Sequence, residues 1–276
     1  MRYCTVVTPD HIDKSIALHR SLRLHDDAAA TFVLVTGPCP SINEPGLTTH
    51  SLEMLAAADP IIQAIVAKYA TMADELRWSL KSAYLRRLIL DDSHPVIYLD
   101  CDICFFGSPE PLWHALDGGA VLLTPHWRLR DPDVSIHNFR LNYLDGLFNA
   151  GCVGATRGGV SALEWWARAC LSACENAREK GLFNDQRYLD LLPVYFDDVV
   201  ISRHRGCNVA DWNRHLVRQR TDEGIFVDGW PLVFVHFTRN TIAAITSGRD
   251  PVLVECLSEY TALLDRVTRE CGEWHS

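Results

Sequence analysis

The chain has 276 residues, and 26 lysines and arginines against 35 aspartates and glutamates give it a formal charge of −9 at pH 7. Nucleic acids and anionic membranes bind clustered cations, and the longest basic run here is the pair Arg86-Arg87, so the composition argues against a nucleic-acid partner. Apolar residues make up 48% of the chain, which is enough for a buried core and excludes global disorder.

The start of the chain and its cysteines favour a cytoplasmic protein. The ten cysteines are a small fraction of the sequence, and the first residues form an apolar strand pattern without a signal region. No stretch reaches the roughly 18–20 apolar residues of a membrane span. We therefore expect mostly buried, reduced thiols and no transmembrane segment, so that a lipid-bearing substrate would be met at a membrane surface.

The first half of the chain alternates strand and helix patterns. Apolar runs at residues 3–8 and 32–35 flank a stretch in which apolar residues recur at helical spacing. A helical zone is predicted over residues 60–90, and strands are predicted at residues 96–99 and 120–124. Strand, helix and strand in this order indicate an α/β domain with parallel strands.

The second half begins with an irregular stretch at residues 126–147, and a connection of this length is uncommon unless it carries function or moves. A helix is predicted over residues 160–180, a strand over residues 232–237, and an amphipathic helix at the end of the chain. No repeat or linker divides the sequence. We expect one domain over residues 1–250 and a C-terminal helix over residues 251–276 that packs on the domain or on a partner.

An acidic pair follows the strand predicted at residues 96–99. Asp100 and Asp102 are two residues apart, so in an extended segment both carboxylates lie on one face and can bind one hard cation. Ligands of open α/β sheets bind beyond the carboxyl ends of the strands, where this pair stands. The pattern predicts a divalent metal site for a nucleoside diphosphate, with an ordinary solvated turn as the alternative.

Other polar residues lie at positions where a ligand could approach. His236 ends a late strand and is either a third metal ligand, which would suit manganese better than magnesium, or a hydrogen-bonded histidine at a strand end. Asn149 is followed by small residues that allow close approach, or it is a plain strand-edge residue. Asp185 and Gln186 stand near a predicted helix start, where Asp185 is alternatively an N-cap.

Two aromatic residues and two cysteine pairs have simpler explanations. Trp165-Trp166 stands in the middle of a helical pattern and is expected in the core. Cys101 and Cys104 have thioredoxin-like spacing, but they do not open a helix. Two further cysteines, at positions 170 and 174, are one helical turn apart, and no second Cys-x-x-Cys completes a zinc set. A redox or zinc function is therefore disfavoured.

The order of these motifs resembles bacterial sugar-nucleotide-dependent glycosyltransferases. The motifs are, in chain order, YLDCD, FNAGCVG, a Trp-Trp helix, GLFNDQRYLDLLP, GCNVADWN and VFVHF. The resemblance extends from about Trp78 to Phe237 and is nearest to the glycosyltransferase family 8-like group. It implies the GT-A fold, a Rossmann-like α/β nucleotide-diphospho-sugar transferase fold with a mixed sheet flanked by helices, here with a C-terminal amphipathic helix.

The resemblance also implies roles for the residues that match the family's motifs. The acidic pair matches the motif that holds Mn²⁺ or Mg²⁺ on the donor diphosphate, and His236 matches the later histidine ligand. Asn149 matches a contact to the donor sugar. Asp185 with Gln186 matches the pair beside the anomeric carbon in members that retain the anomeric configuration.

Further positions complete the donor site implied by the resemblance. Lys81 falls where relatives often carry Lys-Pro, although Ser82 replaces the proline here, and Thr8 and Asp10 lie where the first strand would meet the nucleoside. The lysine that family members place after the late histidine is missing. Arg239 is predicted to replace it, since a guanidinium suits phosphate. The match of Asn208, Trp212 and Asn213 to a further family element implies no settled role.

The sequence thus predicts a metal-dependent hexosyltransferase of cell-envelope polysaccharide synthesis. Its donor would be a nucleotide-diphosphate sugar, a UDP-sugar by resemblance, and its acceptor a saccharide or a glycolipid, with retention at the anomeric carbon. The irregular stretch, with His126, Arg128 and Arg130, is the predicted acceptor loop or lid. Two alternatives stay open: a haloacid-dehalogenase-type phosphatase with Asp100 as nucleophile, and a non-catalytic nucleotide-sugar-binding domain.

Overall fold

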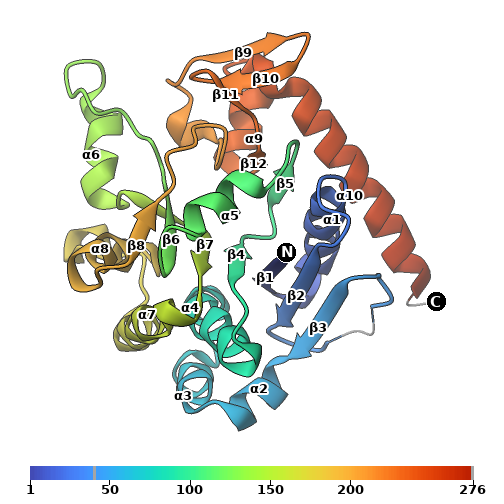
Figure 1. Cartoon of the computed structure of the whole chain (residues 1–276), viewed down its shortest axis with the longest axis vertical. Coiled ribbons are helices and arrows are strands. Elements are labelled where there is room, and N and C mark those ends of the chain that lie inside the picture. The colour runs from blue at the N-terminus through green and yellow to red at the C-terminus, as the bar shows by residue number, and fades with distance from the viewer. Residues whose placement is uncertain (40–41, 275–276) are drawn as a thin grey trace.

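A seven-stranded mixed sheet runs through the centre of the molecule, in the strand order β3-β2-β1-β4-β7-β6-β8 (Figure 1). The structure is a computed structural model that describes residues 1–39 and 42–274. The strands of the sheet are β1 (Arg2–Val7), β2 (Ala30–Val35), β3 (Leu47–Ser51), β4 (Val96–Leu99), β6 (Val121–Pro125), β7 (Phe148–Ala155) and β8 (Val199–Ile201).

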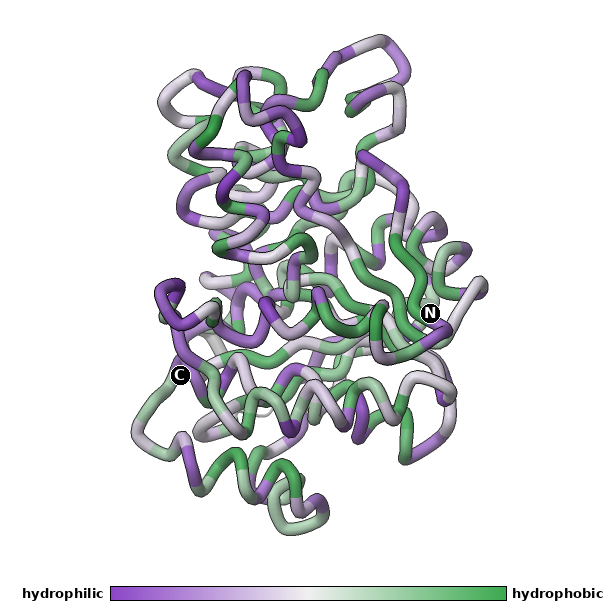
Figure 2. The backbone as a smooth tube through the Cα atoms, turned by 90° about the vertical axis from the view of Figure 1, so that its left-hand side faces the viewer, coloured by the Kyte–Doolittle hydropathy of each residue, from purple (hydrophilic) through white to green (hydrophobic). Residues whose placement is uncertain are grey.

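The sheet changes direction next to β4. Strands β3, β2, β1 and β4 are parallel, as the alternation of strand and helix predicts, whereas β7 runs antiparallel to both β4 and β6. Every residue of β4 and β7 is buried, because these strands lie in the middle of the sheet with elements on both faces. Figure 2 shows hydrophobic segments concentrated in the middle of the molecule.

Helices cover both faces of the sheet. They are α1 (Ile12–Arg23), α2 (Leu52–Ala58), α3 (Pro60–Tyr69), α4 (Ala73–Asp92), α5 (Glu110–Leu116), α6 (Ile136–Leu144), α7 (Val160–Ser172), α8 (Leu192–Tyr195), α9 (Arg239–Thr246) and α10 (Val254–Trp274). Successive side chains of β4 point to opposite faces. Val96 and Tyr98 pack with apolar residues of α3, α4 and α7, whereas Ile97 and Leu99 pack with residues of α1 and α5.

Two small sheets complete the fold beyond the carboxyl ends of the parallel strands. Strand β5 (Ile103–Phe105) pairs antiparallel with β12 (Phe234–His236), and three short strands form a separate sheet: β9 (Arg218–Thr221), β10 (Gly224–Val227) and β11 (Trp230–Pro231). The first pairing matters for the site, because it joins the segment that precedes α9 to the segment that follows Asp100. It sets His236 opposite Ile103.

The last helix, α10, runs along the outside of the molecule beside α1 (Figure 1). Its Tyr260 ring stacks on Phe237 with the ring centroids 4.3 Å apart, and its Val267 is buried against Ile16 and Val35. A C-terminal amphipathic helix is thus present, and the mixed sheet flanked by helices confirms the fold class predicted from the sequence. Residues 275 and 276 of the predicted helix lie outside the described part.

Two predicted elements differ from the structure. The helix predicted over residues 160–180 ends at Ser172, because side chains bind the carbonyl groups of its last turn: Tyr69 binds that of Cys170, and Lys68 binds those of Leu171 and Ser172. The stretch at residues 126–147 is not irregular throughout, since α6 begins after Ser135, whose hydroxyl caps the Asn138 N–H.

The helical zone predicted at residues 60–90 is two helices, α3 and α4, separated at residues 70–72. Trp166 of α7 is fully buried, which confirms the prediction that it belongs to the core. Within the described ranges, 1–39 and 42–274, no helix has the length and apolar character required to cross a membrane.

Replacing Val267 by alanine tests how firmly α10 is held. Val267 is 0% exposed, so we expect Val267→Ala to lower the free energy of unfolding by roughly 1–3 kcal/mol. Urea unfolding followed by circular dichroism measures this. Val254→Ala is the matched control, because Val254 lies on the same helix and is 48% exposed. Equal stability of the two variants would contradict the packing of α10 described above.

Candidate functional site

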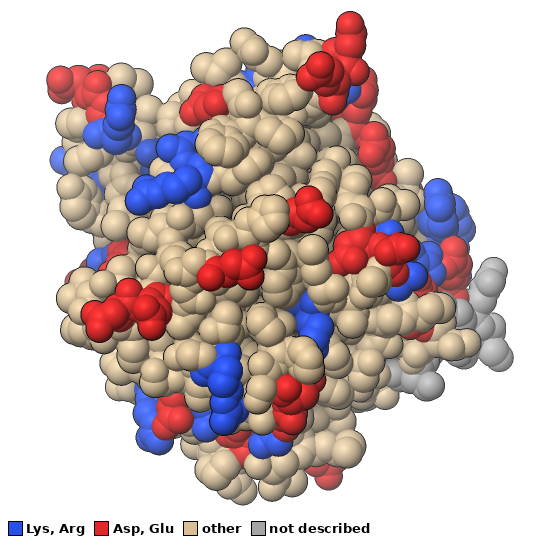
Figure 3. All heavy atoms as spheres, viewed as in Figure 1, with Lys and Arg blue, Asp and Glu red and all other residues tan. Residues whose placement is uncertain are grey.

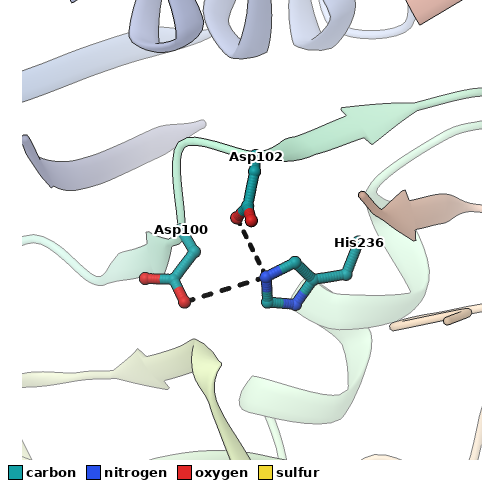
Figure 4. A group of neighbouring side chains, drawn as sticks. All are labelled: Asp100, Asp102 and His236. Atoms are coloured by element: carbon teal, nitrogen blue, oxygen red, sulfur yellow. Dashed lines mark ion pairs between the residues drawn. The ribbon is translucent and has the colours of Figure 1, made fainter. Parts of the chain in front are cut away.

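An acidic turn stands at the carboxyl end of β4. Asp100 follows β4 directly, and Asp102 precedes β5. The turn is fixed by hydrogen bonds from the Asp100 N–H to the Gly151 carbonyl (2.8 Å) and from the Ile103 N–H to the Asp100 carbonyl (3.1 Å). The backbone of β7 therefore holds the turn in place, and the two carboxylates point to the same side, as Figure 4 shows.

His236 completes a cluster with these two carboxylates. Its Nε2 lies 2.9 Å from Asp102 Oδ1 and 3.8 Å from Asp100 Oδ2 (Figure 4). One ligand atom from each of the three residues lies within 4.8 Å of the others, and the described residues contain no other such group of three that could hold a metal ion. The pairing of β5 with β12 creates this arrangement, and the Phe237 N–H donates to the Asp102 carbonyl (2.8 Å).

Asp102 and His236 each favour the charged form of the other. Burial opposes ionisation of Asp102, but His236 lowers the pKa of Asp102 below its ordinary value. Burial also opposes a charge on His236, whereas Asp102 raises the pKa of His236. A metal ion would bind His236 only in its neutral form, so the negative charge that attracts such an ion comes from the two carboxylates. Two carboxylates and one imidazole are a donor set that fits a divalent ion such as Mn²⁺, which accepts nitrogen more readily than Mg²⁺ does.

Lys81 of α4 lies behind the acidic turn. Its Nζ is 2.9 Å from Asp100 Oδ1 and 3.6 Å from Asp185 Oδ2, and its side chain is buried. Burial opposes its charge, but Asp100 and Asp185 raise the pKa of Lys81 above the ordinary value. The Tyr98 hydroxyl also donates to Asp100 Oδ1 (2.8 Å). Asp100 is thus oriented by two donors on the side away from His236.

The absence of a side chain at Gly151 lets neighbouring side chains lie close to the backbone of β7. A Cβ atom at this position would lie 2.6 Å from both Asn149 Oδ1 and His236 Cε1, and 2.8 Å from Asp100 Oδ2. Real Cβ atoms do not approach other atoms so closely, so only glycine fits here. The sequence analysis expected the small residues after Asn149 to allow close approach, or Asn149 to be a plain strand-edge residue. Asn149 lies in the continuous strand β7, and the side chains near Gly151 approach the backbone of this strand closely.

The amides of Asn149 and Gln186 form a buried network. Gln186 Oε1 accepts from the Asn149 side chain and from the Ala150 N–H, both at 3.2 Å, while Gln186 Nε2 donates to the Asp145 carbonyl (2.8 Å). Gln186 Oε1 therefore already accepts two hydrogen bonds from within the protein. Asn149 Nδ2 also lies 3.4 Å from His126 Nε2. Together these bonds fix the segment that follows Asp185 against β7.

Asp185 stands at an N-cap position but its side chain does not act as a cap. It precedes the 3₁₀ helix η4 (Gln186–Leu191), but its side chain caps no N–H group of this helix. Instead the carboxylate points toward Lys81, its Oδ2 has no hydrogen-bond partner, and its carbonyl accepts from Trp166 Nε1 (2.8 Å). Burial is the main cause that raises the pKa of Asp185 to about 6. A buried carboxylate without a hydrogen bond is a candidate for contact with a ligand.

The sequence analysis missed Arg77 and gave Trp212 no settled role, and the structure brings both residues to the site. Arg77 lies one turn before Lys81 on α4. Burial opposes its charge, but Asp74 and Asp100 raise the pKa of Arg77. The spacing of four residues on a predicted helix was the available signal. Trp212 lies between His126 and His236, with ring centroids 5.3 Å from each, and its Nε1 is buried without a partner.

Three predicted site residues, Thr8, Asp10 and Arg239, make no described contact with the rest of the predicted site. Thr8 follows β1, and its hydroxyl lies 3.2 Å from His11 Nδ1, whereas the side chain of Asp10 is 77% exposed. Arg239 is exposed at the first residue of α9, three residues after His236. All three stand at the carboxyl edge of the sheet or near β12. Their predicted roles toward nucleoside and phosphate remain predictions.

The remaining element of the resemblance, around Asn208, is mostly internal. Asn213 donates to the Asn208 carbonyl (2.9 Å) and accepts from the Ala210 N–H (3.0 Å), so it braces the loop. The side-chain amide of Asn208 is buried with no partner for either polar atom.

Cys101 and Cys104 are buried with free thiols, and burial raises the pKa of each. This is consistent with the predicted lack of redox chemistry at these cysteines.

No family model matches the chain. Two proteins of Bacillus subtilis (strain 168) are each 28% identical to it. The uncharacterized protein YfnF aligns over 259 residues, which are 88% of this chain and 82% of YfnF. The uncharacterized protein YfnD aligns over 257 residues, which are 87% of this chain and 78% of YfnD.

Solved structures of glycosyltransferases have a similar fold. The galactosyltransferase LgtC, in complex with donor and acceptor sugar analogues, has a TM-score of 0.56 over 96% of each chain, with 14% identity. Mouse xyloside xylosyltransferase 1 has a TM-score of 0.52 over 87% of this chain and 98% of the enzyme, with 12% identity. The chain therefore has the GT-A fold, as the sequence predicted. A sheet of this topology does not support the phosphatase alternative.

Replacing Asp185 by asparagine tests the buried carboxylate through the pH dependence of stability. Because the pKa of Asp185 rises to about 6 in the folded chain, the native state binds more protons than the unfolded state between the ordinary pKa and this value. The stability contributed by Asp185 thus falls as the pH rises through this window. We expect Asp185→Asn to become more stable relative to the wild type from about pH 4 to pH 7, by up to about 3 kcal/mol.

Urea unfolding across this pH range, in the presence of a chelator, measures the difference. Asp197→Asn controls for the loss of one negative charge, since Asp197 is exposed. A stability difference that does not change with pH, or that has the opposite slope, would show that Asp185 is an ordinary ionised carboxylate.

Proposed function

We propose that the protein is a metal-dependent glycosyltransferase that moves a sugar from a nucleotide-diphosphate donor to a saccharide or lipid-linked acceptor. The observation that carries this proposal is the cluster of Asp100, Asp102 and His236 at the carboxyl edge of a GT-A fold, with the cation Lys81 behind it. In this fold a ligand enters beyond the carboxyl ends of the strands. A diphosphate there needs positive charge, which an acidic chain must supply locally.

The three clustered residues would hold Mn²⁺ or Mg²⁺. When bound, the ion supplies a Lewis acid that stabilises the negative charge on the departing diphosphate. In the reaction the acceptor hydroxyl forms a bond to the anomeric carbon, and the bond from that carbon to the diphosphate oxygen breaks. The nucleoside diphosphate leaves with the electron pair, and the hydroxyl proton passes to the leaving phosphate oxygen.

The residues of the chain contribute position and charge. Lys81 keeps Asp100 oriented, and Arg77, one helical turn away, adds a second cation on the same face of α4. Thr8 and Asp10 would contact the nucleoside, and Arg239 would bind phosphate from the start of α9. We take the donor to be a UDP-sugar and the compartment to be the cytoplasm, where precursors of cell-envelope polysaccharides are made.

Asp185 is the group we place beside the anomeric carbon. Its Oδ2 has no hydrogen-bond partner, whereas the oxygen of Gln186 already accepts two hydrogen bonds within the protein. This difference supports Asp185 as the group facing the reacting sugar and gives Gln186 the role of positioning it. Asn149, bound to the same network, would contact a sugar hydroxyl.

Titration of metal and donor tests the proposal directly. We expect Mn²⁺ together with one member of a panel of UDP, GDP, CMP and dTDP sugars to raise the melting temperature of the wild type. Asp102→Asn should weaken that donor's apparent affinity at least about tenfold, because a ligand of the metal is lost. Asp198→Asn, at an exposed residue, is the matched control.

Equal stabilisation of Asp102→Asn and the wild type would contradict the metal site. Arg77→Gln and Arg239→Ala in the same titration identify which arginine binds the diphosphate, and an unchanged affinity in Arg239→Ala excludes that residue. Binding of a nucleotide sugar with neither transfer nor hydrolysis would favour a non-catalytic binding domain.

The stereochemistry of the product tests the assignment of Asp185. We expect the sugar to keep the anomeric configuration that it has in the donor, as the match of Asp185 and Gln186 to retaining members implies. Proton NMR of freshly formed product distinguishes the anomers by the coupling constant of the anomeric proton. A product of inverted configuration would contradict the retaining assignment while leaving the transferase activity intact.

A further inference from the structure

A cavity of about 510 Å³ lies next to the loop that follows His126. One wall is formed by residues 127–131, which follow β6, and the other by residues from the segment that leads into and out of the β9–β10 hairpin. Cavities of roughly 300–1,000 Å³ commonly bind small ligands. Neither the metal cluster nor the predicted donor contacts belong to its lining.

The cavity is connected to the metal cluster through aromatic rings. Trp127, in its wall, directly follows His126, whose ring lies 5.3 Å from that of Trp212, and Trp212 in turn lies 5.3 Å from His236. A molecule in the cavity would therefore lie on the His236 side of the site. This is a suitable place for the acceptor, which must reach the sugar held at the cluster.

The lining is cationic in a chain whose overall charge is negative. Three arginines line the cavity, Arg128, Arg130 and Arg205, and Figure 3 shows a patch of basic side chains on this face, between α6 and the segment before β9. Arg128 is the most buried. Its side chain is 7% exposed, it binds Asp145 (2.7 Å), and its Nε has no partner. Asp145 also binds Arg178 (2.6 Å), so two guanidinium groups share one carboxylate.

Arg205 and Trp127 form a flat, charged surface. The guanidinium carbon of Arg205 lies 3.2 Å from the centroid of the Trp127 ring, and Arg205 also donates to the Arg203 carbonyl (2.8 Å). Trp127 has φ 53°, a conformation that is uncommon for a bulky residue. Backbone strain of this kind is typical of ligand sites. The guanidinium covers one face of the indole, so a sugar ring would contact the edge or the opposite face of Trp127 while its negative charge pairs with the guanidinium.

The acidic residues of the lining do not neutralise these cations fully. Asp131 Oδ1 accepts from the Asp133 N–H (2.9 Å), and Asp228 Oδ1 accepts from the Val217 N–H (2.8 Å), so both carboxylates are held by their own loops. Burial lowers the pKa of Arg205, and Asp228 only partly compensates. Arg130 is exposed and forms no hydrogen bond or ion pair with any described residue.

We propose that this cavity binds the acceptor through a negative charge, so that the acceptor is an acidic saccharide whose carboxylate or phosphate pairs with Arg130 and Arg205 while its ring packs on Trp127. The inference rests on the proposed transferase function, because it assigns the second substrate of that reaction. It adds a chemical class to an acceptor that the fold alone leaves undefined.

Saccharide binding without donor tests this. Isothermal titration and saturation-transfer-difference NMR compare glucuronic acid and glucose 6-phosphate with glucose, and inorganic phosphate serves as the probe of a bare anion. We expect at least one charged sugar to bind about tenfold more tightly than glucose, with contacts to indole protons, and Arg205→Gln or Arg130→Gln to remove about that factor. Arg203→Gln is the matched control, since Arg203 is exposed and outside the lining.

Tighter binding of glucuronic acid would identify the acceptor as a uronic acid. Tighter binding of glucose 6-phosphate would identify it as a phosphorylated saccharide. Equal binding of glucose and both charged sugars, or equal binding of inorganic phosphate and the sugar phosphate, would overturn the inference. Arg130→Gln removes an exposed side chain, so it remains informative if Arg205→Gln is unstable.

Donor hydrolysis separates this inference from the proposed function. With Mn²⁺ and donor alone, the wild type and the control variant Arg203→Gln should release nucleoside diphosphate at equal rates, because water replaces the acceptor. Charged-sugar binding by a protein that hydrolyses no donor would refute the transferase and leave the cavity as an acidic-saccharide site. Donor hydrolysis without selective binding of charged sugars would refute only the inference about the cavity.

Discussion

Lys81 places one buried ammonium group between carboxylates from two distant parts of the chain, Asp100 after β4 and Asp185 before η4. Three carboxylates, these two and that of Asp102, would repel one another if no cation stood among them. Because Lys81 comes from the interior of α4, its position depends on the packing of α4 against the sheet and against α7. A change that loosens the apolar core on this side of the sheet would therefore move Lys81 and disturb the charge balance of the site.

The second constraint is the joining of distant segments at the carboxyl edge of the sheet. Asp102 and His236 are far apart in sequence, and the pairing of β5 with β12 brings them within 2.9 Å. The stack of Tyr260 on Phe237 then connects α10 to the residue that follows His236. The position of the imidazole thus depends on the last helix as well as on the two short strands. Such short strands would be marginal without these contacts.

Much of the fold could be predicted from the sequence because its strands are short apolar runs and its helices are periodic. The antiparallel strand β7 could not, since its small and polar residues do not form an apolar run and a local pattern does not report the direction of a strand in the sheet. The end of α7 was also beyond prediction, because it depends on donors from Lys68 and Tyr69, about a hundred residues away. Local patterns do not report which distant side chain will bind a carbonyl group.

The sequence predicted the parts of the site whose geometry follows from residue type and spacing. It did not predict the parts whose geometry depends on packing between distant segments. The convergence of Asp100 and Asp102 follows from the pleat of an extended chain. The addition of His236 needed the resemblance, because a lone histidine after an apolar strand is ambiguous. Arg77 and the Asp185 oxygen that lacks a hydrogen bond became visible only with the orientation of α4. The cavity next to Trp127 depends on two loops whose contact no sequence pattern shows.

Gly151 has a consequence for how this protein can change over evolutionary time. Its φ is not among the positive values of the described residues, so no backbone strain requires glycine, and the three atoms nearest to an added Cβ atom belong to the Asn149, His236 and Asp100 side chains. The restriction is therefore imposed by function and not by folding. In a lineage that lost those side chains, position 151 would be free to drift. The residue found there thus records whether a descendant still maintains the cluster.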